Sequence, residues 1–96
     1  MKVGLAELEL FLPESSSLKD KRRILKSIID RVRNKYNVSI VEVDHFDLWK
    51  RATIAVANVC RESKEIRDVF SRIERLVEVY SQAEIIRREV HILTPE

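Results

Sequence analysis

SKEIRDVFSRIERLVEVY, residues 63–80, is the stretch that decides the fold of this chain. Its apolar side chains recur at alternating spacings of three and four residues, which places them along one face of an α-helix. They are Ile66, Val69, Phe70, Ile73, Leu76, Val77 and Tyr80. Ser63 is a suitable cap, because a serine hydroxyl accepts a hydrogen bond from a backbone amide of the first turn. We therefore predict an amphipathic helix with one buried face.

A second helical pattern lies upstream, after the three serines at positions 15–17. Its apolar face repeats at helical spacing and consists of Leu18, Leu25, Ile28, Ile29, Val32 and Tyr36. Asn37 follows, and asparagine is a common residue just beyond a helix end. The chain is therefore predicted to contain two helices of similar length.

Four further segments have the apolar content and alternation of β-strands, namely residues 2–12, 38–45, 50–60 and 84–93. The predicted order is then β-α-β-β-α-β. Two helices that cover one face of a four-stranded antiparallel sheet form a ferredoxin-like sandwich of the α+β class. Because no linker or low-complexity tract interrupts the pattern, we expect a single domain over residues 1–96.

Side-chain alternation along each strand predicts which residues face the helices. Those expected to point inward are Leu8, Leu10, Leu12, Val41, Val43, Ile86, Val90 and Ile92. Those expected on the open face are Leu5, Glu7, Glu9, Phe11, Ile40, Glu42, Arg87, Glu89 and His91. Strand 50–60 is ambiguous, because both of its faces carry apolar side chains. An open face of this kind leans acidic and lacks stacking aromatic rings, which favours self-association or a protein partner over RNA there.

The composition restricts the class of protein. Of the 96 residues 35% are charged, yet the formal net charge is only +2, so any affinity for nucleic acid must come from a local patch. A single cysteine, Cys60, excludes an internal disulfide. We see no signal-peptide pattern and no apolar run long enough to span a membrane, so we expect a cytoplasmic protein without a membrane partner. Abundant charges of both signs and one glycine indicate a thermophilic source.

A local patch of positive charge lies in residues 19–35, which hold eight Lys or Arg against two Asp. Cations in the first turns of a helix are unfavourable unless an anion or an acidic neighbour compensates them. We name the basic ridge as the candidate phosphate-binding surface, and it consists of Lys19, Lys21, Arg22, Arg23 and Lys26. The alternative is a solvated helix face whose cations pair with acids such as Asp20, Asp30 or glutamates of the second helix.

The remaining candidates lie between the two middle strands. Trp49 and Arg51 could stack a base or anchor a protein contact beside the ridge. The alternative is that Trp49 folds over an edge of the core. Asp44, His45 and Asp47 are metal-ligand types, but three ligands so close in one turn rarely converge on one ion. We therefore predict no metal, no cofactor and no catalytic residue.

Three segments, in this order and at this spacing, resemble the YlxP-like family of small bacterial proteins of unknown function. They are Ser17-Leu18-Lys19-x-Lys21-Arg22, Asn37-Val38-Ser39 and Asp47-Leu48-Trp49-x-Arg51-Ala52. The resemblance extends over nearly the whole chain and implies a ferredoxin-like fold. Genes of this family often lie among those for transcription, translation and ribosome maturation, which implies a connection to RNA or the ribosome. No catalytic residue is established for the family, so the resemblance implies none here.

Two hypotheses about function follow from these observations. The first is a non-catalytic binding module, associated with RNA or ribosomal particles through the basic ridge, with Trp49 and Arg51 as accessory contacts. The second is a structural or protein-interaction module that forms homo-oligomers through its open sheet face. An unpaired ridge would favour the first hypothesis, and a ridge neutralised by acids would favour the second.

Overall fold

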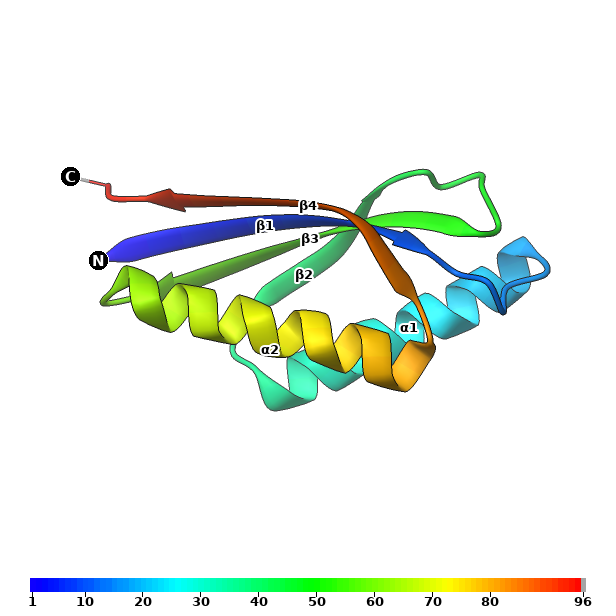
Figure 1. The fold of residues 1–96 in the computed structure, drawn as a ribbon, viewed down its shortest axis with the longest axis horizontal. Coiled ribbons are helices and arrows are strands. Elements are labelled where there is room, and N and C mark those ends of the chain that lie inside the picture. The colour runs from blue at the N-terminus through cyan, green and yellow to red at the C-terminus, as the bar shows by residue number, and fades with distance from the viewer. Residues whose placement is uncertain (96) are drawn as a thin grey trace.

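The chain folds into two layers, a four-stranded sheet and a pair of helices that cover one of its faces (Figure 1). The computed structural model describes residues 1–95. In chain order the elements are β1 (Lys2–Phe11), α1 (Leu18–Lys35), β2 (Ser39–Asp44), β3 (Arg51–Cys60), α2 (Ser63–Ser81) and β4 (Glu84–Leu93). The strands lie in the order β2-β3-β1-β4, and every neighbouring pair is antiparallel. The predicted ferredoxin-like α+β sandwich is therefore confirmed.

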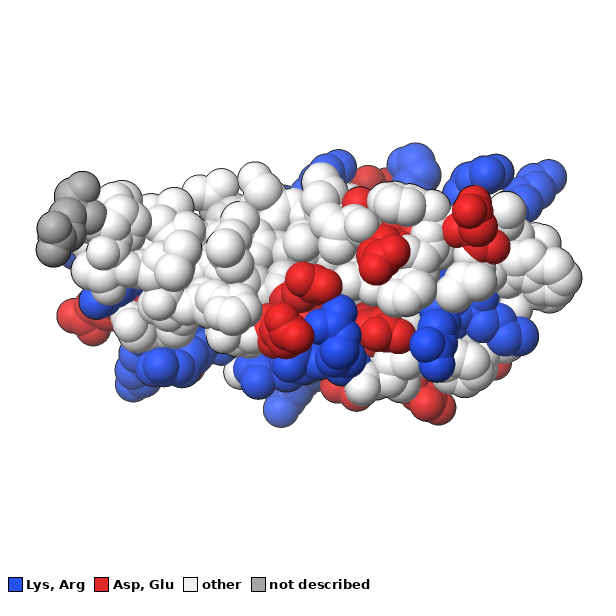
Figure 2. Space-filling model, turned by 90° about the horizontal axis from the view of Figure 1, so that it is seen from above, with Lys and Arg blue, Asp and Glu red and all other residues white. Residues whose placement is uncertain are grey.

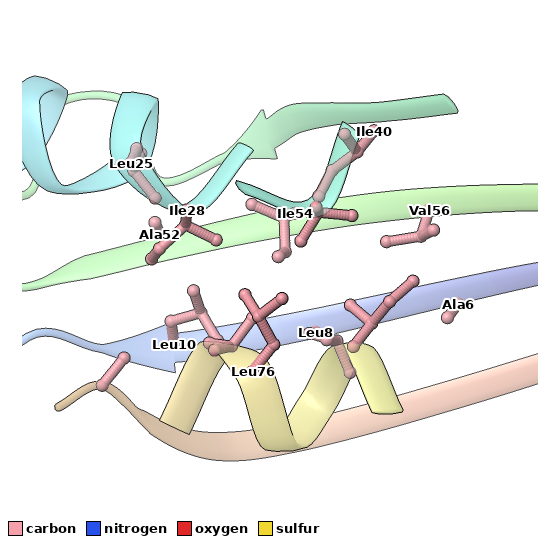
Figure 3. Packing of buried hydrophobic residues seen from close by; sticks show 14 of the residues in the cluster. Ala6, Leu8, Leu10, Leu25, Ile28, Ile40, Ala52, Ile54, Val56 and Leu76 are labelled. Carbon is pink, nitrogen blue, oxygen red and sulfur yellow. The ribbon is translucent and has the colours of Figure 1, made fainter. Parts of the chain in front are cut away.

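The core lies between the helices and the inner face of the sheet (Figure 3). Leu8 of β1 pairs with Ile54 of β3, and the neighbouring even-numbered positions of β1 follow the same alternation. Leu8, Leu10 and Leu12 are all buried, as predicted. The apolar stripe of α2 supplies the opposite wall, with Ile66, Phe70, Ile73, Leu76 and Val77 buried.

The N-terminal half of α2 approaches the sheet most closely at Gly4. A Cβ atom placed on Gly4 would overlap Cγ2 of Ile66 and would lie 3.0 Å from the ring of Phe70. Gly4 faces inward on the central strand, so any larger residue there would push α2 away from the sheet. This close approach gives the single glycine of the chain a packing role.

The start of α1 is stabilised by hydroxyl groups. Ser17 is the N-cap, and its Oγ accepts a hydrogen bond from the backbone amide of Asp20 at 3.0 Å. The Asp20 carboxylate in turn accepts bonds from Oγ and the backbone amide of Ser16, at 2.6 and 3.1 Å. These two bonds, with a smaller contribution from Arg23, lower the pKa of Asp20 below its ordinary value. The carboxylate near the helix N-terminus also opposes the effect of the cations that follow it.

The ends of the helices differ slightly from the predictions. Ser63 is the first residue of α2 rather than its cap, and the cap is Glu62, which makes no side-chain capping bond. The helix ends at Ser81, and its C-cap Gln82 has a left-handed backbone at φ 55°. The helix α1 ends at Lys35 with Tyr36 as its C-cap, one residue before the predicted stop at Asn37.

The predicted sidedness of β2 is wrong. Ile40 is buried opposite Val56, whereas Val41 and Val43 are exposed on the open face. Glu42 points toward the helices, not away from them, because a lysine of α1 lies there to receive it. The prediction was wrong because both faces of this edge strand carry aliphatic residues, so alternation alone does not identify the inner face. It also assumed that the Glu42 side chain would face solvent.

Because of a β-bulge, the predicted sidedness of β4 is right in one part of the strand and wrong in the other. Val90 and Ile92 face inward beside Ala6 and Gly4, as predicted. The register then shifts between Glu9 and Leu10 of β1, so that Ile85 pairs with Leu10 and packs against the core. Ile86, predicted to point inward, is exposed. A bulge adds one residue to a strand and reverses the alternation beyond it.

Candidate functional site

The basic ridge is not uniformly exposed, because Lys21 lies in the core. Its side chain is 3% exposed, and Nζ lies 3.0 Å from Oε2 of Glu42. The same Nζ donates a hydrogen bond to the carbonyl oxygen of His45 at 2.5 Å. No other side chain or backbone group described in residues 1–95 hydrogen-bonds to that carboxylate oxygen. Lys21 therefore connects α1 to β2 and to the turn that follows, and it is not available to an external phosphate.

The exposed cations of the ridge are partly neutralised by acids on the same helix. Lys26 Nζ lies 2.7 Å from Oδ2 of Asp30, and Arg23 Nη2 lies 3.7 Å from Oδ1 of Asp20. For Lys19 and Arg22, the part of the chain that the structure describes holds no carboxylate oxygen within 4.0 Å. Exposed pairs of this kind contribute only about 0.2–1 kcal/mol. The ridge thus keeps two cations without an acidic partner.

Trp49 is exposed instead of folding over the core. Its side chain is 55% exposed in the connection between β2 and β3, and it lines a shallow depression with its neighbours from Asp47 to Arg51. Arg51 begins β3, and its Nη1 lies 3.2 Å from Oε2 of Glu9 on the open sheet face. The two predicted accessory residues therefore lie close in sequence, but Arg51 is engaged on the open face rather than beside the ridge.

Two of the residues of metal-ligand type, Asp44 and His45, form a turn. His45 has a left-handed backbone at φ 63°, its amide donates to Oδ1 of Asp44, and its Nδ1 lies 2.8 Å from Oγ1 of Thr53. Within residues 1–95, no group of three His, Cys, Asp or Glu side chains is arranged to hold a metal ion. Asp44 and His45 serve the reversal of the chain before β3.

The open face of the sheet has two distinct parts, which Figure 2 shows from above. A charged cluster lies near the middle, where Arg87 contacts Glu7 at 2.8 Å, Glu89 at 3.0 Å and Glu9 at 3.3 Å. Hydrogen bonds to Glu7 and Glu9 raise the pKa of Arg87 above its already high value. The guanidinium is therefore held in place by three carboxylates.

A broad area without charged side chains adjoins this cluster and continues toward the chain termini (Figure 2), and it contains several exposed aliphatic residues. We call it the apolar sheet face, and it consists of Leu5, Val41, Ala55, Ala57, Val59 and Leu93. Leu5 is 42% exposed, Val41 51% and Val59 65%. A hollow of about 270 Å³ lies over its centre, between β1 and β2.

Sequence reasoning found only part of the apolar sheet face. It placed Leu5 there but assigned Val41 to the core and left Val59 unassigned. The available signal was the run of aliphatic residues on both faces of β3, which is unusual for a sheet that has one face in water.

In the part of the chain that the structure describes, neither helix has the length and apolarity that a membrane crossing requires.

Comparison with known proteins identifies the family of this chain and agrees with its fold. The family described as "Protein of unknown function (DUF503)" matches residues 3–90. The uncharacterized protein YlxP of Bacillus subtilis (strain 168) is 38% identical over 81 residues, which cover 80% of this chain and 88% of that protein.

Solved structures share the fold. A de novo designed protein with a ferredoxin fold, LFR1 1, aligns with a TM-score of 0.64 at 17% identity, over 95% of this chain and 86% of that one. An antibiotic biosynthesis monooxygenase aligns with a TM-score of 0.52 at 12% identity, over 100% of this chain and 99% of that one. At such identities the likeness extends to the fold alone, because one fold supports many unrelated activities.

Proposed function

This chain belongs to the DUF503 family of proteins of unknown function, as its resemblance to YlxP indicated, and we propose that it is a non-catalytic module that self-associates through its apolar sheet face. The observation that carries this proposal is the exposure of aliphatic side chains from all four strands on one continuous surface. Single exposed aliphatic residues are ordinary, whereas a contiguous patch marks an interaction site.

The size of the face suits a second copy of the chain. The molecule extends 44 Å along its longest axis and 18 Å along its shortest, the two directions in the plane of Figure 2. Their product, which outlines the whole open face including the charged cluster, is of the order of the ~800 Å² that each partner buries in a standard interface. A nearly flat sheet also matches a copy of itself, as a two-fold interface requires.

The charges on the open face support the same occupant. Glu7, Glu9 and Glu89 already have Arg87 as their partner. Each of these carboxylates keeps a cation contact when the face is covered, and with Arg51 on Glu9 the cluster carries a net charge of −1 from three carboxylates and two guanidinium groups. An unpaired buried charge would be strongly unfavourable. These same carboxylates would repel an RNA backbone, so the open face does not suit a nucleic acid.

The test is sedimentation equilibrium of the wild type and two matched variants. We expect the wild type to have at least twice the monomer mass at micromolar concentration. Val41→Lys should convert it to a monomer, because the substitution places a charge in the apolar interface. Val79→Lys changes a valine on α2 that is even more exposed, and it should leave the mass unchanged. A monomeric wild type, or equal dissociation by both variants, would refute the proposal.

RNA binding through the basic ridge is the second candidate. The specific observation in its favour is that Lys19 and Arg22 have no carboxylate oxygen within 4.0 Å in the described part of the chain. If the ridge contacts phosphates, Arg22→Ala with Arg23→Ala should reduce the log–log salt slope of RNA binding by about 1.4, at roughly 0.7 for each phosphate. Thermal stability should hardly change, because both side chains are exposed. An unchanged slope would assign the ridge to a solvated helix face.

A further inference from the structure

A groove of about 740 Å³ runs between the end of α1 and the outer side of α2. Both helices lie on the opposite side of the sheet from its open face (Figure 1). Its lining residues on α2 recur at helical spacing and are Asp68, Ser71, Arg72, Arg75, Leu76, Val79 and Tyr80. Lys35 and Tyr36 line it from the end of α1. Both helices thus contribute side chains to one surface, which we call the helix groove. It is separate from the basic ridge, which occupies the first half of α1.

The helix groove is rich in cations without acidic partners. Lys35, Arg72 and Arg75 line it, against the single carboxylate of Asp68. Residues 1–95 place no carboxylate oxygen within 4.0 Å of any of these three cations, although nine such pairs form elsewhere. Three like charges facing one groove repel each other, and an anion there would relieve the repulsion.

Aromatic rings accompany these cations. Tyr80 is 63% exposed, and the guanidinium carbon of Arg31 lies over one face of its ring, 4.6 Å from the centre, so a base would stack on the opposite face. Lys35 Nζ lies 5.9 Å from the ring of Tyr36. An exposed ring flanked by cations is the arrangement on which proteins stack nucleic-acid bases while they bind the adjacent phosphates. An acidic peptide without aromatic residues, such as polyglutamate, would use the cations but would have no aromatic ring to place on Tyr80.

We propose that the helix groove binds single-stranded nucleic acid, with phosphates on Lys35, Arg72 and Arg75 and a base stacked on Tyr80. This site is independent of self-association, because the sheet face and the helix groove lie on opposite sides of the molecule. It also differs from the ridge in every residue. Binding should show little sequence preference, since stacking and phosphate contacts accept any base.

Fluorescence anisotropy with a short labelled oligoadenylate tests the proposal across a salt series. Three phosphate contacts predict a log–log salt slope near −2, at roughly −0.7 for each phosphate on a single strand. Arg72→Ala with Arg75→Ala should reduce the magnitude of the slope by about 1.4. The matched control is Lys64→Ala with Arg67→Ala, which removes the same charge from exposed positions of α2 outside the groove and should leave the slope unchanged.

Tyr80→Leu separates stacking from charge. A stacked base contributes about 1–3 kcal/mol, so this variant should weaken binding by roughly 5- to 150-fold while the salt slope stays the same. All the substituted side chains are exposed, and thermal melting of each variant should match the wild type.

Four outcomes would overturn the proposal. They are no binding by the wild type at low salt, equal losses from the groove and control pairs, no effect of Tyr80→Leu, and equally tight binding of a polyglutamate peptide. If the loss instead follows Arg22→Ala with Arg23→Ala, the site is the basic ridge and the helix groove is refuted.

Discussion

Lys21 shows how one residue can have the opposite role from its neighbours in sequence. It belongs to a run of cations, and nothing in its own identity separates it from Lys19 or Arg22. In the folded protein its ammonium group lies beside the edge strand β2, where it pairs with Glu42 and donates a hydrogen bond to the carbonyl oxygen of His45. The helical rotation of 100° per residue places position 21 toward the sheet, while its neighbours remain in solvent.

Removing this lysine should destabilise the fold. In Lys21→Met the Glu42 carboxylate loses the cation that pairs with it, and the loss of one member of a buried pair costs roughly 3–5 kcal/mol. Because Glu42 is partly exposed, we expect a value near the lower end. The double variant Lys21→Met with Glu42→Leu should recover most of the stability, as replacement of both partners by apolar groups removes the stranded charge. Urea titration measures both values, and a single-variant loss under about 0.5 kcal/mol, typical of surface changes, would contradict the assignment.

The close packing of Ile66 and Phe70 over Gly4 leads to a second prediction. Gly4→Ala should lower the free energy of unfolding by about 1–3 kcal/mol, since its methyl group would overlap Ile66 in a packed core. Chemical denaturation of the two proteins tests this. The prediction is wrong if the free energy of unfolding instead rises by about 0.4–1 kcal/mol, as it does when alanine only restricts the unfolded chain. That result would mean that α2 shifts to accommodate the methyl group without strain.

At the scale of elements, α2 contributes most to the core and α1 most to the surface charge. Five residues of α2 are buried along one stripe, and they face the central strands (Figure 3). The helix α1 buries fewer apolar side chains and carries eight of the chain's eighteen Lys and Arg residues. The helix α2 therefore mainly stabilises the sheet by burying apolar side chains, whereas α1 mainly presents charge to solvent.

The stripe of α2 predicts a clear contrast between two positions. Ile73→Ala should cost roughly 2–5 kcal/mol, because it leaves a cavity at a fully buried site. Val79→Ala, on the exposed side of the same helix, should remain within about 0.5 kcal/mol. Denaturant titration of both variants tests the packing, and a loss at Ile73 no larger than at Val79 would mean that the stripe does not face the sheet.

At the scale of the whole molecule, the two faces differ in chemistry. The sheet presents aliphatic side chains beside an ion-paired cluster, and the helical layer presents cations and tyrosines. Such a division suits a protein that joins a copy of itself on one side and binds an anionic partner on the other. A small domain also gains stability when a partner covers its apolar face.

Self-association should make stability depend on protein concentration. A partner that binds only the folded state raises the melting temperature by mass action, so dilution of the wild type should lower its Tm. Val41→Lys should have a Tm that does not change on dilution, whereas Val79→Lys should behave as the wild type does. Differential scanning calorimetry at several concentrations measures this, and a constant wild-type Tm would contradict self-association.

The order of elements, the helix stripe of α2 and the ferredoxin-like class were all predictable from the sequence. Each depends on periodicity within a single segment, as at Ile66, Phe70 and Ile73, and the spacing of apolar residues reveals it without knowledge of any partner. The family resemblance was equally accessible, because it depends on short motifs along the chain.

Only the tertiary structure decided the direction of Ile40 and Ile86, the burial of Lys21 and the placement of Lys35 and Arg72 along one groove. Strand sidedness depends on bulges, which alter the register against a neighbour far away in sequence. The burial of a charge depends on whether a partner such as Glu42 lies opposite. Contacts between segments distant in the chain govern all four features, and no local pattern of residues encodes them.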